Sequence, residues 1–167
     1  MLFRSGLKKV SAERVRQEMM KLVVASRAVP TLKLMALSGV LKTIIPYTDD
    51  WRVIGRLPED QVLRLYALAK KPESLKEHLR LSNAESQRID DLNTAPDLSS
   101  RLRLQEQRAM LYHLSEQAWV DAVQMSWARG KASKNDQKWQ ALLSLPKHWP
   151  IPKLPINGND LLKAGVA

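Results

Sequence analysis

The stretch from residue 11 to residue 25 places its apolar side chains at the spacing of a helix. These side chains recur at intervals of four, three and one, and they are Val15, Met19, Leu22 and Val23. They would form one apolar face on a helix of 3.6 residues per turn. Ser11 precedes the pattern and suits an N-cap, because its hydroxyl can accept a hydrogen bond from a free amide of the first turn. A helix of this kind has to bury one face, so the rest of the chain must supply a partner surface.

The remaining composition is also that of a helical protein. The chain has only 6 Gly among 167 residues and no Cys, which removes disulfides and Cys-based zinc sites. Lys and Arg number 27 against 17 Asp and Glu, a net charge of +10, which favours an anionic partner: nucleic acid first, a membrane surface second. No apolar run approaches the roughly 18 residues of a membrane-spanning helix, and the first residues lack the long apolar run of a secretory signal. We therefore expect a cytoplasmic protein without a membrane partner.

Turn and cap residues divide the chain into further helices. Gly39 suits the position after a helix end, Pro46 stops another helix, and Ser82 with Glu85 forms a capping box. The predicted helices lie at about 11–25, 30–38, 40–45, 58–70, 72–80, 83–94, 100–113, 115–129 and 139–145. Residues 47–57 are expected to form a loop. The fold class is therefore all-α, an irregular array of about eight to nine helices, divided into a region 1–95 and a region 96–167.

Two helices have an alternative interpretation. The pair 73–80 and 83–94 resembles a DNA-binding helix-turn-helix, but its second helix carries Glu85, Asp90 and Asp91 against Arg88, which we expect to point outward. So acidic a helix is a poor match for phosphates. In the helix 115–129, the broad face with Trp119 and Trp127 is interpreted as core rather than as a platform for stacking bases.

Four segments resemble one enzyme family in the family's own order. The 11–25 helix reads Ser-x-Glu-Arg-Val-x-x-Glu-x-x-Lys-Leu, and residues 29–41 read Val-Pro-Thr-Leu-Lys-Leu-Met-Ala-Leu-Ser-Gly-Val-Leu. Residues 80–85 read Arg-Leu-Ser-Asn-Ala-Glu, and residues 154–166 end in Asp-Leu-Leu and Gly-Val. These segments resemble the neck, the neck–body junction, the body and the tail of the class II tRNA nucleotidyltransferases (CCA-adding enzymes) and bacterial poly(A) polymerases. The resemblance implies a parent enzyme that adds nucleotides to RNA 3′ ends, using magnesium with ATP or CTP.

The residues that would do this chemistry are absent from the sequence. Neither the Gly-Ser turn nor the Asp-x-Asp pair of the family's catalytic head is present, and the base-reading motif Glu-Asp-x-x-Arg is also absent. His78, His113 and His148 are too far apart for a zinc motif. We therefore expect no catalytic residue, no metal ligand and no cofactor in this chain. The resemblance implies that the catalytic head is a missing N-terminal partner, and it leaves CCA addition and poly(A) synthesis both open.

The expected function is RNA binding in tRNA processing, without catalysis by the chain itself. Glu13, Arg14 and Glu18 match the neck motif, and the resemblance implies that they brace the neck against the nucleotide site. Phosphate contacts with tRNA or another RNA 3′ end are assigned, by charge alone, to Arg101, Arg103, Arg108, Arg129, Lys131, Lys134 and Lys138. The alternative is a stand-alone basic helical adaptor that binds a protein or an acidic surface.

Overall fold

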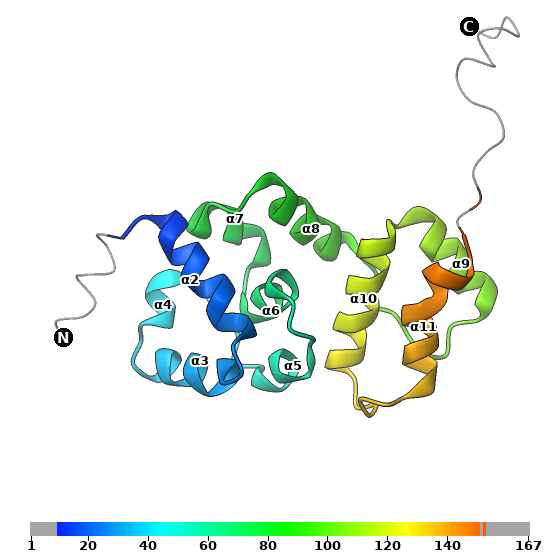
Figure 1. Ribbon diagram of the computed structural model, residues 1–167, viewed down its shortest axis with the longest axis horizontal. Helices are drawn as coiled ribbons and strands as arrows, with labels where there is room; N and C mark the ends of the chain where they lie inside the picture. Colours follow the sequence, from blue (N-terminus) through cyan, green and yellow to red (C-terminus); the bar gives the residue numbers. More distant parts are fainter. Residues whose placement is uncertain (1–9, 151, 153–167) are drawn as a thin grey trace, which may run out of the picture.

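The computed structural model describes residues 10–150 and residue 152, and within them the fold is all-α (Figure 1). The described residues contain ten α-helices and one 3-10 helix, and no strand beyond an isolated bridge between Tyr47 and Ala69. The elements are α2 Ala12–Val24, α3 Ala28–Leu37, α4 Leu41–Ile44, α5 Trp51–Arg56, α6 Gln61–Leu68, η1 Pro72–Ser74, α7 Leu75–Leu79, α8 Asn83–Thr94, α9 Leu104–His113, α10 Glu116–Arg129 and α11 Gln137–His148. None of the described helices combines the length and apolar character needed to cross a membrane.

The predicted helix starts are confirmed where a short polar side chain precedes the helix. The Ser11 hydroxyl accepts from the backbone N–H of Arg14 at 3.3 Å, so it caps α2. Ser82 and Glu85 form the capping box of α8, with the Ser82 N–H donating to Glu85 Oε2 at 2.7 Å. Gly39 follows α3 with a φ of 73°, a left-handed conformation that glycine adopts without strain. Local hydrogen-bonding chemistry thus fixes these boundaries.

The predicted loop at residues 47–57 is wrong, because α5 lies inside it. Asp50 caps this helix by accepting from the N–H of Val53 at 3.3 Å. Val53 and Ile54 are then buried in the core. A helix of only six residues is not stable on its own, so tertiary packing holds α5 in place and the local pattern gives little sign of it.

The last helix, predicted at 139–145, extends further in the structure, because Pro146 lies inside α11. A proline has no N–H, so it leaves the carbonyl four residues earlier, that of Leu142, without its helical donor. The indole of the buried Trp119 donates to this carbonyl at 2.8 Å. The side chain of α10 thereby replaces the missing bond and allows α11 to continue to His148.

Three clusters of buried apolar side chains hold the helices together. The first lies among α2–α8 and includes Val23, Leu32 and Leu65, while the second lies among α9–α11 and centres on Trp119. Figure 1 shows these two groups of helices next to each other. A third cluster joins them and consists of Val53, Leu57, Leu63, Leu92, Met125 and Ala128, from α5, α6, α8 and α10 and the turn after α5. The division at residues 95 and 96 stays a prediction.

Arg88 was expected to point outward, and this prediction is wrong. Its guanidinium donates to both carboxylate oxygens of Asp121, at 2.6 and 2.8 Å, and to Asp60 Oδ2 at 2.8 Å. The hydrogen bonds that Arg88 donates to Asp121, and also to Asp60, outweigh desolvation and raise the pKa of Arg88 above its usual value. The Asp121 side chain is 1% exposed, so its charge needs a partner. Arg88 therefore joins α8 to α6 and α10.

Two arginines of α5 bind the C-terminal end of α10. Arg52 donates to the carbonyls of Gly130 and Arg129, each at 2.8 Å. Arg56 donates to the carbonyl of Trp127 at 3.3 Å and also to that of Ala132. The last carbonyls of a helix lack intrahelical donors and carry partial negative charge, so cations there are favourable. These contacts fix the start of the segment that leads to α11.

We predict that Arg88→Met lowers the free energy of unfolding by about 3–5 kcal/mol, because it leaves the buried Asp121 carboxylate without its cation. Urea denaturation, monitored by tryptophan fluorescence, measures this loss. The matched control is Arg80→Met, which removes an exposed ion pair with Glu13 at 2.8 Å and should lower the free energy of unfolding much less, because solvent screens exposed pairs. Equal losses in the two variants would contradict the role given to Arg88.

Candidate nucleic-acid interface

The helices α2, α3 and α4 enclose an open groove of about 800 Å³. The groove lies beside α2, which buries Met20 and Val23 in the core and places other residues of the helix beside α3 and α4. Its floor is largely apolar and includes Val15, Leu22, Met35, Val40 and Ile44, while Arg14, Glu18 and Lys21 also line it. The result is an apolar groove with charged side chains along α2.

The three neck-motif residues lie on α2 but have different surroundings. Glu13 accepts from Arg80 at 2.8 Å, and a backbone hydrogen bond, followed by that from Arg80, lowers the pKa of Glu13. Glu18 accepts from Lys21 at 3.1 Å. Arg14 lines the groove and has no ion pair within the described part of the chain. Their proposed bracing role stays a prediction.

The cations assigned to phosphate contact fall into two groups. Four of them, all exposed, make no ion pair among residues 10–150: Arg101, Lys131, Lys134 and Lys138. The other three are already engaged. Arg103 pairs with Glu106 at 2.8 Å, Arg129 pairs with Asp97 at 2.9 Å, and Arg108 lies over the Trp149 ring at 5.6 Å from its centroid.

Three of the free cations lie on one segment, the loop between α10 and α11 together with the first turn of α11. We call residues 131–138 the basic loop. Gly130 ends α10, and Asp136 caps α11 by accepting from the N–H groups of Lys138 and Trp139 at 3.0 and 3.2 Å. The backbone at both ends of the loop is therefore fixed, while Lys131, Lys134 and Lys138 remain in solvent. Such an arrangement offers a cluster of positive charge to an anion at little conformational cost to the backbone.

The sequence did not reveal the structural roles of several arginines, because their partners are distant in the chain. Arg56 anchors the basic loop to α5 through the Ala132 carbonyl, Arg52 binds the Gly130 carbonyl just before the loop, and Arg16 pairs with Glu85 at 2.8 Å across 69 residues. Nothing local in the sequence distinguishes these arginines from solvated ones.

The structure also disfavours the helix-turn-helix interpretation, because α8 uses Arg88 in the buried junction and packs Ile89 and Leu92 into the cores.

A family model described as the probable RNA and SrmB-binding site of polymerase A matches residues 3–52. The match covers less than half of the chain and supports a poly(A) polymerase-related RNA-binding region there. Its described part contains α2, α3 and α4, so it coincides with the groove. Neither the curated proteins nor the solved structures contain a significant match. The tail-like stretch 154–166 lies outside the described residues.

We predict that Glu85→Gln makes the free energy of unfolding less dependent on pH under acidic conditions. Burial opposes ionisation of Glu85, but the Ser82 amide and Arg16 outweigh it and hold the pKa below its usual value of 4.5. Its stabilising contribution is therefore complete above that usual value and is lost as the pH falls through the lower folded-state pKa. Between neutral pH and about pH 3, the free energy of unfolding should fall less steeply in Glu85→Gln than in the unsubstituted chain. Identical pH profiles would contradict the assignment.

Proposed function

We propose that this chain is the RNA-binding helical portion of an enzyme that adds nucleotides to RNA 3′ ends, and that the chain itself does no catalysis. The observation that carries the proposal is the match of residues 3–52 to an RNA-binding region of polymerase A. The net charge of +10 supports it, because neutralised phosphates release counterions and so drive association.

Two surfaces of the structure suit this role. Arg14 and Lys21 lie beside the groove within the matched region. The basic loop presents Lys131, Lys134 and Lys138 without competing carboxylates as ion-pair partners in the described part. Lysines of this kind contact phosphate oxygens and position an RNA, but they read little sequence. The surfaces therefore suit an RNA recognised by shape and backbone, and we propose tRNA as the substrate of the parent enzyme.

The parent enzyme would need magnesium and ATP or CTP, as the family resemblance implies. Among the described residues, no group of three or more His, Asp or Glu side chains lies close enough to hold a metal ion. These side chains do not fit a two-metal site, so we place the metal and the nucleotide on the proposed catalytic head. The neck residues Glu13, Arg14 and Glu18 would then face that head.

A second candidate function is a basic adaptor that binds a protein. The observation that favours it is the apolar surface of α3, where Leu34 is 66% and Leu37 is 85% exposed. The groove beside it is apolar as well, and the description of the matched family names SrmB in addition to RNA. Exposed apolar patches of this kind often mark protein contacts.

We predict that the chain binds a folded tRNA lacking CCA more tightly than an unstructured RNA of equal length, and that added salt weakens the binding. Replacing Lys131 and Lys134 with Ala should lower both the affinity and the salt slope, the slope by about 0.7–0.9 per lost phosphate contact. The matched control replaces Lys71 and Lys76, exposed lysines before η1 and on α7, and should change both values much less.

The titration is a fluorescence anisotropy measurement at two salt concentrations, with a nucleotidyl transfer assay on the same protein. Equal and weak binding of the two RNAs, unchanged by Lys131→Ala and Lys134→Ala, would contradict the proposal and favour the adaptor. Nucleotide addition by the chain alone would contradict the absence of catalysis.

A further inference from the structure

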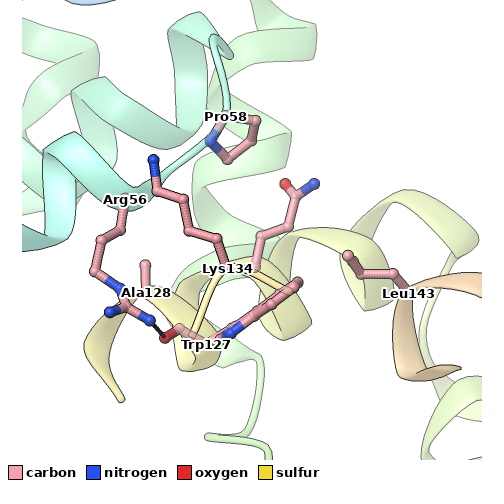
Figure 2. Close-up of a pocket in the computed structure, with 7 residues that line it drawn as sticks. Arg56, Pro58, Trp127, Ala128, Lys134 and Leu143 are labelled. Carbon is pink, nitrogen blue, oxygen red and sulfur yellow. Dashed lines mark hydrogen bonds between the residues drawn. The ribbon is translucent and has the colours of Figure 1, made fainter. Parts of the chain in front are cut away.

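A pocket of about 240 Å³ lies where the end of α5 approaches α10 and the basic loop. Arg56 and Pro58 line it from the α5 side, and Gln124, Trp127, Lys134 and Leu143 line it from α10, the loop and α11. Figure 2 shows Arg56, Pro58, Lys134 and Trp127 around this space. It is smaller than the roughly 300–1,000 Å³ of typical ligand cavities, so it suits one base rather than a large ligand.

The aromatic wall of the pocket is held in place. The Trp127 indole stacks on Trp139, with the ring centroids 6.1 Å apart and the planes 5° from parallel. Its Nε1 donates to the carbonyl of Ser133 at 3.0 Å, and Arg56 binds the Trp127 carbonyl. Trp127 lines the pocket, whereas its stacking partner Trp139 does not. A ring fixed in this way loses little freedom when a second flat group stacks on it.

The polar groups of the pocket are cationic or neutral. No carboxylate lines it, and Lys134 has no ion pair in the described part of the chain. The Nη2 of Arg56 serves backbone carbonyls, while its Nη1 has no acceptor among the described residues. The Gln124 amide likewise makes no hydrogen bond within residues 10–150 and can both donate and accept. A fixed aromatic ring, an amide and two cations match a base with its phosphate.

We propose that this pocket binds one nucleotide of single-stranded RNA, with the base against Trp127 and Gln124 and the phosphate near Lys134 and Arg56. The inference rests on the proposed RNA-binding function and adds a named contact to it. It revises the sequence interpretation of the α10 face: Trp119 is fully buried and belongs to the core, whereas Trp127 is half-buried and presents part of its ring to the pocket. Stacking of bases on aromatic rings is a usual mode of binding for single strands.

The test compares a six-nucleotide oligoadenylate with an abasic oligomer that has the same number of phosphates. The unsubstituted chain should bind the oligoadenylate about 10-fold or more tightly than the abasic oligomer, because only the oligoadenylate has bases that can stack. Binding should also quench part of the tryptophan fluorescence. Trp127→Leu should abolish the preference and that quench, with circular dichroism confirming the fold. The matched control Trp51→Phe, a tryptophan outside the pocket, should keep both.

A second variant addresses the phosphate contact without disturbing the core. Lys134→Ala changes an exposed lysine that lines the pocket, and Lys76→Ala changes an exposed lysine of α7 that does not. Lys134→Ala should weaken adenosine monophosphate binding, and Lys76→Ala should leave it unchanged.

Two further outcomes distinguish failure of the nucleotide pocket alone from failure of the proposed RNA-binding function. Binding of both oligomers with equal affinity, unaffected by Trp127→Leu, would overturn the nucleotide pocket and leave RNA binding through the backbone intact. Absence of binding to either oligomer, together with absence of tRNA binding, would overturn both.

Discussion

The carboxylate of Asp121 lies almost completely out of water, and the arrangement of the helices depends on how its charge is balanced. Arg88 supplies a two-pronged contact and Gln117 adds a hydrogen bond at 2.8 Å. The same guanidinium reaches Asp60, whose other oxygen caps α6 by accepting from Leu63 at 2.9 Å. An unbalanced charge at this depth would cost several kcal/mol, so α6, α8 and α10 are constrained to meet here. The third apolar cluster lies between the same helices and stabilises the same arrangement.

This junction also determines where the basic loop sits. With α10 fixed against α6 and α8, its C-terminal carbonyls lie within reach of Arg52 and Arg56 on α5. Those contacts hold the start of the basic loop, and the Ser133 carbonyl in turn orients the Trp127 indole. The groove at α2–α4 and the pocket at α10 therefore belong to one packed array.

The two kinds of cation serve different purposes in this protein. The arginines at buried or half-buried positions bind backbone carbonyls and carboxylates: Arg16, Arg56, Arg64 and Arg88. A planar guanidinium with several donors suits such contacts. The lysines of the basic loop remain in solvent, where a flexible ammonium group can follow a phosphate backbone. The net charge of +10 thus overstates the positive charge that is free for RNA, because part of it stabilises the fold.

The sequence predicted the features that depend on neighbouring residues and missed those that depend on distant ones. The caps at Ser11 and Ser82 and the turn at Gly39 follow from local hydrogen bonding and backbone geometry, and the structure has them. The inward position of Arg88 could not be predicted, because Asp121 lies 33 residues away. For the site, charge identified the lysines of the basic loop. The pocket beside them needs α5, and α5 exists only through tertiary packing.

The most direct measurement of the central claim is photochemical cross-linking of a 4-thiouridine-containing RNA to the intact chain, with the cross-linked peptides identified by mass spectrometry. The account predicts cross-links at Trp127 and within residues 131–138, and others within α2 and α3. Cross-links confined to α7 and α8 would contradict it.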